Sequence, residues 1–361
     1  MNSTINTDED VITQLTNDAI QQRIPCIIFI GCLIFIGIIG NIHVLALFSR
    51  TYLKPSTYTV FVKTLSLVDL ITCLVHMPIE IVDLVKPYTF YSEVGCKLFR
   101  LNNAFLVMVS TSILILIAIE RYRRVCNPLK RQMTVSVSKW LCCLVVFISL
   151  FISLPMYFLN GHHIVSLERN GINATGYMCF ISDKFHGSIF LYSYLGFMII
   201  VFIVSSCLLI NAYFSISRVV FSRHASIMRG RKQTIDVRKD ISTISGSDLN
   251  SQDYHKYSKC SHEDLYRNYS QTSLKSTTLK TTRPLIFITG IFIVMFAPYL
   301  ILNVVNSLDK EFKENLSNLQ LTFYQIGVRL LLINNASNPF VYGFTDERFK
   351  NGMKRAYCLW K

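Results

Sequence analysis

Apolar residues along the chain are gathered into seven long runs separated by polar segments. The runs cover about residues 25–48, 57–85, 97–120, 139–159, 187–214, 285–307 and 320–344. A helix needs about 20 apolar residues to cross a hydrocarbon core of about 30 Å, and each run meets that length. The pattern predicts an all-α membrane protein, with a seven-transmembrane helix bundle over residues 25–344 and an N-terminal tail over residues 1–24.

Two polar segments interrupt or follow the bundle. Residues 215–284 are rich in Ser, Thr, Lys and Asp and show little apolar periodicity, which predicts a largely disordered loop whose ends continue helices five and six for a few turns. Its hydroxyl groups are either phosphorylation sites or part of a solvated spacer. In residues 345–361, Phe349 and Met353 recur at helical spacing between basic residues, as in an amphipathic helix on the membrane surface. Cys358 in this helix is a candidate for palmitoylation, or else a plain thiol.

Charge gives the bundle an orientation. Lys and Arg are concentrated in the polar segments after spans one, three, five and seven, whereas the N-terminal tail is acidic. The bias predicts an extracellular N-terminus and a cytoplasmic C-terminus. The formal net charge is +14. In a soluble protein this excess of basic residues would suggest binding of nucleic acid. Here it is explained by cytoplasmic Lys and Arg beside the anionic inner leaflet of the plasma membrane.

Two cysteines and two asparagines become candidates for extracellular modification. Of the eleven cysteines, only Cys96 and Cys179 lie in segments predicted to be outside, so these two are the disulfide candidates. Asn2 and Asn173 begin Asn-x-Ser/Thr sequences on the same side and are candidate glycosylation sites.

The cytoplasmic end of the third run is Glu120-Arg121-Tyr122, at the position of the Asp/Glu-Arg-Tyr motif of the rhodopsin-like (class A) G protein-coupled receptors. The chain resembles that family over about residues 40–350. The other motifs that carry the resemblance are Gly40-Asn41, Leu65-Ser66-Leu67 with Asp69, Trp140, Phe292 with Pro298, Asn338-Pro339-Phe340-Val341-Tyr342, and Phe349.

The resemblance implies a transducer that activates a heterotrimeric G protein. Arrestin, receptor kinases and membrane lipid are further partners expected from the family. The residues implied in coupling and activation are Glu120, Arg121, Tyr122, Tyr213, Asn338, Pro339 and Tyr342. Those implied in transmission between the two ends are Phe292, Phe296 and Pro298.

Three positions depart from the family pattern. Phe296 stands where most relatives have a tryptophan, and Ser205 stands where helix five usually has a proline. Thr278 stands where helix six usually begins with an acidic residue. Without that acid, Arg121 would be held at rest by Glu120 alone, which predicts elevated basal signalling.

A carboxylate in the middle of a membrane is costly and needs partners, and Asp69 is in that position. The family holds a sodium ion at such a site. The resemblance assigns that role to Asp69, Ser110, Asn334 and Asn338, with a network of waters as the alternative. No other cofactor is expected.

The candidate ligand site lies at the outer end of the bundle. The seventh run has no lysine for a retinal Schiff base, and Asn103 stands where amine receptors have a carboxylate. His76, Glu80 and Asp83 share one helical face by i, i+4 and i+7 spacing. The two carboxylates would suit a cationic group of a peptide, unless they reach outward to water. The candidate ligand-binding residues are His76, Glu80, Asp83, Arg100, Asn103, Tyr299, Asn303 and Arg329.

These features favour a receptor for a neuropeptide, similar to the peptide-receptor branches of the family. A lipid or other small ligand, or a seven-helix protein that does not couple to G proteins, is the alternative. A transporter would show inverted repeats, which are not found. An enzyme would need a catalytic constellation at one depth, and the sequence offers none, so no enzymatic activity is expected.

Overall fold

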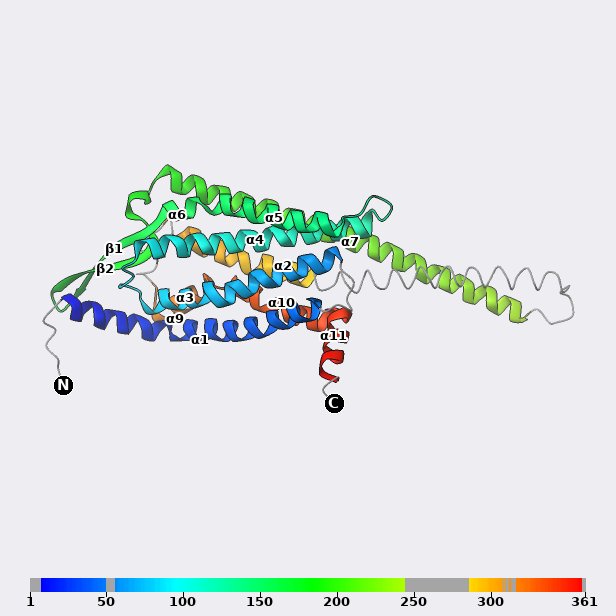
Figure 1. The fold of residues 1–361 in the computed structure, drawn as a ribbon, viewed down its shortest axis with the longest axis horizontal. Helices are drawn as coiled ribbons and strands as arrows, with labels where there is room; N and C mark the ends of the chain where they lie inside the picture. The colour runs from blue at the N-terminus through cyan, green and yellow to red at the C-terminus, as the bar shows by residue number, and fades with distance from the viewer. Residues whose placement is uncertain are drawn as a thin grey trace.

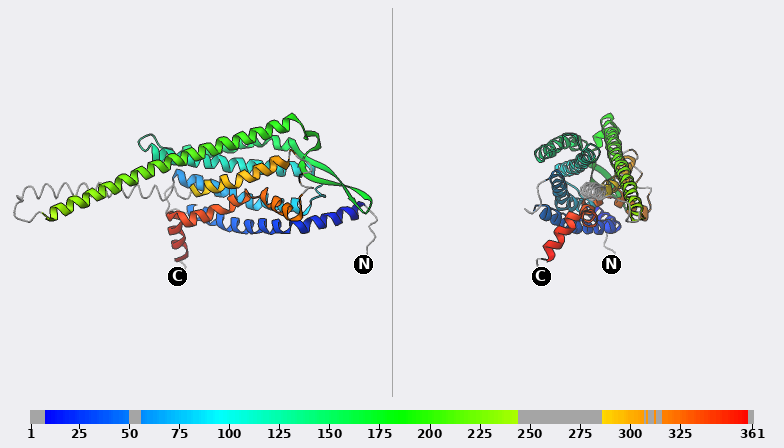
Figure 2. Two further views of the ribbon diagram at one scale, coloured as in Figure 1. Left: turned by 180° about the vertical axis from the view of Figure 1, so that it is seen from behind. Right: turned by 90° about the vertical axis from the view of Figure 1, so that its right-hand side faces the viewer.

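The computed structural model describes residues 8–49, 56–243, 286–306, 308, 312 and 316–358. Its long helices run side by side as a bundle, with a β-hairpin at one end and a short helix lying across the other (Figure 1). Seen end-on, the helices surround a common interior (Figure 2). The end that holds the hairpin is called the Cys96 end below, and the opposite one the Arg121 end.

The first helix, α1 (Asp8–Ser49), begins well before the predicted span. Three acidic residues in its first turn favour that start, because they face the positive end of the helix dipole. The extension is tied to the hairpin, since Arg169 donates to Asp18 over 2.6 Å. Most of the predicted tail is therefore helical, and residues 1–7 lie outside the described part.

The second span is α2 (Thr57–Ile71), a π-helical turn η1 (Thr72–His76) and α3 (Met77–Val85). Pro78 has no amide hydrogen and crowds the preceding turn, which accounts for a wider turn at this point. His76, the last residue of this turn, and Glu80 of α3 are both buried.

The third and fourth spans follow the prediction closely. The third is α4 (Glu93–Cys126), which is capped by the Ser92 side chain accepting from the Gly95 amide over 3.0 Å. The fourth is α5 (Val135–Ser153), continued after a bend at Pro155 by α6 (Pro155–Leu159).

The fifth helix, α7 (Ile189–Thr243), continues far beyond the bundle and projects from the Arg121 end (Figure 1). Residues 215–243 are thus helical where a largely disordered loop was predicted. The rest of that loop, residues 244–285 with Thr278, lies outside the described residues. The sixth span is the helix Ile286–Asn306.

The seventh span is broken into α9 (Asn318–Gly327) and α10 (Leu332–Thr345). Between them the amides of Arg329, Leu330 and Leu332 bond three residues back, which is the tighter 3₁₀ pattern. Within the described ranges, six helices are long and apolar enough to cross a membrane unbroken. The seventh crossing is made by the two shorter pieces.

The chain then turns into α11 (Glu347–Cys358), which runs nearly perpendicular to the bundle (Figure 1). Phe349 anchors it, stacking on Phe48 with ring centroids 6.3 Å apart. The predicted seven-helix fold with a short eighth helix is confirmed.

The β-hairpin was not predicted. It pairs β1 (Asn160–Arg169) with β2 (Ile172–Ile181) in antiparallel register. Its turn residues, Asn170 and Gly171, both have positive φ, the geometry of a two-residue hairpin turn. An Asn-Gly pair, with Ile164 and Val165 before it and Ile172 after it, is the signal that sequence reasoning overlooked.

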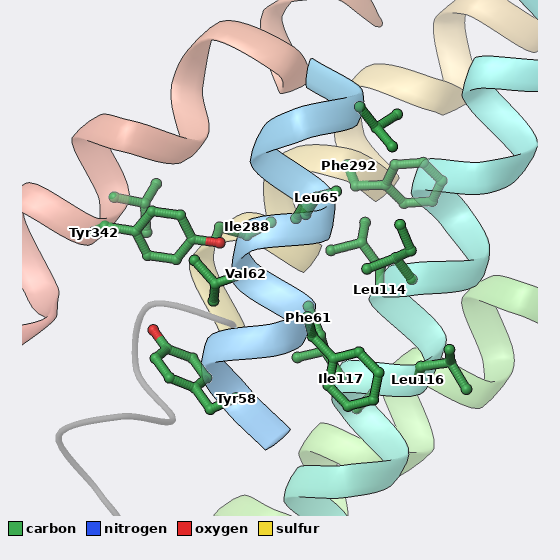
Figure 3. Close-up of a cluster of buried hydrophobic side chains, with 14 of the residues drawn as sticks. Tyr58, Phe61, Val62, Leu65, Leu114, Leu116, Ile117, Ile288, Phe292 and Tyr342 are labelled. Atoms are coloured by element: carbon green, nitrogen blue, oxygen red, sulfur yellow. The ribbon is translucent and has the colours of Figure 1, made fainter. Parts of the chain in front are cut away.

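The largest apolar cluster lies nearer the Arg121 end. Figure 3 shows side chains of α2, α4, α10 and the helix Ile286–Asn306 meeting there, among them Tyr58, Leu114, Phe292 and Tyr342. This cluster is called the apolar plug below, and the cavities described next lie between it and the Cys96 end.

Gly40 lets α1 approach α10 closely. A Cβ placed on Gly40 would lie 2.6 Å from Cγ of Pro339, whereas one on Gly31 would meet nothing within 4 Å. The proline ring is rigid, so α1 would have to move away.

We therefore expect Gly40→Ala to destabilise the protein by about 1–3 kcal/mol, because overpacking forces backbone shifts. Gly31→Ala is the matched control and should leave stability unchanged or slightly higher, since alanine favours helix. Thermal unfolding of the purified protein in detergent measures both. Equal midpoints for the two variants would contradict the packing argument.

Candidate functional site

Two neighbouring cavities lie in the half of the bundle nearer the Cys96 end. The outer one is lined by α1, α3, α4, β2, α9 and the helix Ile286–Asn306. The inner one reaches down to Ser110 and Asn334. Val328 and Arg329, at the break in the seventh span, line both cavities.

The predicted ligand residues all line these cavities. The inner cavity has His76, Glu80, Asn103, Tyr299 and Arg329 in its wall, and the outer one has Asp83, Arg100, Asn303 and Arg329. The structure thus brings the whole set together around two cavities.

Arg329 is the centre of a buried charge cluster. Its Nε donates to Glu80 over 2.8 Å, and its terminal nitrogens lie 2.7 Å from Gln325 Oε1 and 3.5 Å from Asp83. Asp83 is also 3.5 Å from Arg100, which in turn donates to the Cys179 carbonyl over 2.8 Å. Two arginines therefore balance two carboxylates between the cavities.

This pairing differs from the expected free acidic face. Glu80 does not reach out to water, because it is 5% exposed and contacts Arg329. Asp83 is partly exposed and lies 3.5 Å from both Arg329 and Arg100. His76 stacks on Phe99 and has its Nε2 3.5 Å from Glu80.

Some cavity residues were missed by sequence reasoning. Arg23 of the α1 extension and Met178 and Phe180 of the hairpin line the outer cavity. None had a motif to mark it. The Asn-Gly turn would have indicated that a hairpin covers this end.

Asp69 lies below the inner cavity, fully buried. Its Oδ2 accepts from Nδ2 of Asn338 over 2.6 Å, while its Oδ1 has no hydrogen-bond partner among the described residues. The side-chain oxygens of Asn334 and Asn338 are likewise buried and unpartnered within the described part of the chain. Ser110 is also buried. A set of inward-facing oxygens with one carboxylate fits a small hard cation such as sodium.

Aromatic rings connect the cavities to the apolar plug. The Phe296 ring lies 5.6 Å from Tyr299, 5.3 Å from Phe292 and 4.7 Å from Phe202, on which it stacks. Tyr299 lines the inner cavity, so a movement of the Tyr299 ring would displace the Phe296 ring that it contacts. Pro298 lies between them in the same helix.

Arg121 is buried at the other end of α4, only 2% exposed. Its Nε lies 3.1 Å from Glu120, and its guanidinium lies 4.5 Å from the centre of the Tyr58 ring. Glu120 also contacts Arg124 at 2.6 Å and Thr57 at 3.2 Å. Arg121 thus has an aromatic partner as well as the acid.

Tyr58 in turn donates to Asp346 over 2.5 Å, which ties α2 to the start of α11. Thr57, Tyr58, Arg124 and Asp346 were missed, because no family motif includes them. The expectation that Glu120 alone holds Arg121 is therefore incomplete.

The other residues predicted to act at this end, Tyr213, Tyr342 and Tyr122, lie in surroundings that differ from those of Arg121. Tyr213 of α7 and Tyr342 of α10 are buried in the apolar cluster. The Tyr342 hydroxyl has no hydrogen-bond partner in the described ranges. Tyr122 faces outward, 38% exposed.

The predicted disulfide is confirmed. Cys96 at the start of α4 is bonded to Cys179 of β2, with their Cα atoms 5.4 Å apart. The bond joins the hairpin to the third span. Asn173 is exposed on β2, Asn2 lies outside the described residues, and Cys358 is the last residue of α11.

A second link holds the base of the hairpin. The His163 Nδ1 lies 2.6 Å from Asp183 Oδ1, and the Ile164 amide donates to Oδ2 over 3.1 Å. Partial burial alone would raise the pKa of Asp183, but these hydrogen bonds and the nearby histidines outweigh it and lower that pKa below its ordinary value.

Comparison with known proteins decides the family. The family described as "7 transmembrane receptor (rhodopsin family)" matches residues 40–342. The chain belongs to this family of G protein-coupled receptors. It is a family of receptors and not of enzymes.

Several relatives of the receptor are known by sequence. It is 24% identical to the thyrotropin-releasing hormone receptor of Bos taurus over 93% of this chain and 79% of the relative. It is 30% identical to the neuropeptide Y receptor type 6 of Mus musculus over 35% of this chain and 34% of that receptor.

A solved structure confirms the fold. The crystal structure of squid rhodopsin superposes with a TM-score of 0.66, covering 92% of this chain and 84% of that one at 16% identity. At this identity the likeness concerns the arrangement of the helices alone.

The receptor's buried charge cluster predicts a coupling between Glu80 and Arg329. We expect Glu80→Gln or Arg329→Gln alone to destabilise the receptor by about 3 kcal/mol, because each leaves a buried charge short of its partner. The double variant should cost less than the sum of the two. Thermal unfolding of all three in detergent gives the coupling.

Glu93→Gln is the control for this experiment, because it removes a similar ion pair, to Lys97 at 2.7 Å, from the surface. Its unfolding midpoint should stay close to that of the native receptor. Strictly additive effects of the two cluster variants would show that the pair is not coupled.

Proposed function

We propose that this protein is a plasma-membrane receptor for a neuropeptide, with its N-terminus outside and its C-terminus inside, and that it activates a heterotrimeric G protein. The observation that carries the proposal is a polar cavity linked through aromatic contacts to the buried Arg121 cluster. Similarity to receptors named for thyrotropin-releasing hormone and neuropeptide Y supports a peptide ligand.

Peptide binding suits the chemistry of the outer end. A peptide brings amides that both donate and accept, and the two cavities offer carboxylates, guanidiniums, Asn303 and Tyr299. A cationic group on the peptide would compete with Arg329 and Arg100 for Glu80 and Asp83. Replacing one partner of this cluster is a direct way for a ligand to change how the second and seventh spans are joined.

The change would pass through Tyr299, Phe296 and Phe292 to the apolar plug. Pro298 and Pro339 each remove a backbone hydrogen bond, so helices six and seven bend there at lower cost. Opening of the plug would free Arg121 from Glu120 and Tyr58 and let it approach Tyr213 and Tyr342. A G protein would bind the Arg121 end in that state, as would arrestin and receptor kinases.

A peptide-library screen on cells expressing the receptor with a promiscuous Gα subunit tests the proposal. A peptide that triggers nucleotide exchange is the expected result, and Glu80→Gln should lower its potency. Silence to every peptide together with a response to lipid extracts would replace the peptide ligand by a lipid. Silence to both, with no basal exchange, would favour a protein that does not couple.

Basal activity gives a test that needs no ligand. Glu120→Gln should raise basal nucleotide exchange several-fold, because it removes the negative charge that holds Arg121. Tyr58→Phe keeps the ring over Arg121 but loses the bond to Asp346, so its effect should be smaller. Exchange assays in membranes at matched receptor levels compare the two; no change in either would refute the proposed resting contacts.

We further propose that the Asp69 site binds sodium, held by Asp69, Ser110, Asn334 and Asn338. Sodium should then lower agonist affinity relative to potassium at equal ionic strength, and Asp69→Asn should abolish the difference. Agonist binding in the two salts measures it. Equal affinity in both salts for the native receptor would favour a water network instead.

A further inference from the structure

Three side chains with metal-binding atoms meet where the hairpin joins the fifth span. They are His163 of β1, Asp183 of the 3₁₀ turn η2 (Asp183–Phe185) and His186, which ends that turn. One ligand atom from each lies within 4.8 Å of the other two. The cluster belongs neither to the cavities nor to the Arg121 end.

Local backbone geometry explains why the three converge. Side chains three residues apart in a 3₁₀ turn lie one above the other, so Asp183 and His186 project on the same side. The Ile164 amide, donating to Asp183 over 3.1 Å, holds this turn against β1 and brings His163 to the same place. The arrangement is thus held by backbone as well as by side chains.

The donor set suits one class of ion. Two imidazole nitrogens and one carboxylate oxygen are typical zinc ligands, with bonds of about 2.0–2.2 Å, and a water completes a tetrahedron. Tetrahedral bonds of that length put ligand atoms about 3.3 Å apart. Small side-chain rotations would close the distance that remains. The Asp183 side chain is 46% exposed and that of His163 is 22% exposed, so water and ion can enter.

We propose that His163, Asp183 and His186 form a zinc-binding site that fastens the hairpin to the start of the fifth span. On binding, the ion takes the place of the proton between His163 and Asp183. Outside the membrane the ion would come from the surrounding fluid, but binding itself does not depend on the receptor's ligand.

The site is next to a wall of the outer cavity. The Phe180 ring lies 6.3 Å from His163 and 6.1 Å from His186, and Phe180 lines that cavity. Zinc would hold both imidazoles and limit the movement of Phe180. The ion would therefore slow exchange of any ligand bound beneath the hairpin.

Zinc chloride titrated calorimetrically into the purified full-length receptor, carrying no polyhistidine tag, tests the proposal. One ion should bind per receptor. His163→Ala, Asp183→Asn and His186→Ala should each weaken binding by about tenfold or more, as loss of a ligand does. Zinc should also raise the unfolding midpoint of the native receptor and not of these variants.

His162→Ala is the matched control. His162 is the neighbouring residue on β1, and its ring lies 5.3 Å from Tyr177 on the other face of the strand. This variant should bind zinc within about twofold of the native affinity. If the native receptor binds no zinc at millimolar concentration, the contact is a plain His–Asp hydrogen bond and the proposal is overturned. Equal losses of zinc affinity in His162→Ala and His163→Ala would overturn it as well.

Discussion

The ion pair between Arg329 and Glu80 is the contact on which the outer half of the bundle depends. Removing an arginine from water costs several kcal/mol, which only a close carboxylate and further hydrogen bonds offset. Glu80, Asp83 and Gln325 supply them. Because these partners come from the second and seventh spans, the position of one span fixes the other. Arg100 extends the link to the third span and, through the Cys179 carbonyl, to the hairpin.

At each depth of the bundle, a buried polar or charged group is likewise held by partners from other helices, although the residue types differ. Near the middle, Asp69 is satisfied in part by Asn338, and Asn41 donates to the Asn335 carbonyl over 2.9 Å. At the far end, Arg121 is balanced by Glu120 and covered by Tyr58. Between them lies the apolar cluster, which separates the polar layers. A signal between the two ends therefore has to move packed side chains, since the described residues show no continuous chain of charges between them.

The sequence predicted features that depend on composition and spacing. Seven apolar runs fixed the number of crossings, and the placement of Cys96 and Cys179 identified the disulfide. The i, i+4 spacing of His76 and Glu80 put them on one face, as found. What it did not indicate was pairing between distant residues. Glu80 and Arg329 are 249 positions apart, so spacing within a helix carries no information on their contact. Tyr58 and Asp346 were missed for the same reason. The continuation of α7 to Thr243 could not be found from apolar periodicity, because the sequence after residue 215 is rich in polar residues and shows little of it.

The break at Val328–Leu331 bears on how the chain enters the bilayer. Insertion of a helix depends on its length and on its charged residues, and an arginine near the centre of a span costs about 2.5–3.5 kcal/mol. α9 and α10, of 10 and 14 residues, are each too short to cross alone, and Arg329 stands between them. The last crossing is thus poorly suited to independent insertion. It becomes favourable once Glu80 is already in the membrane to receive the arginine, so the final step of assembly depends on the second span made much earlier.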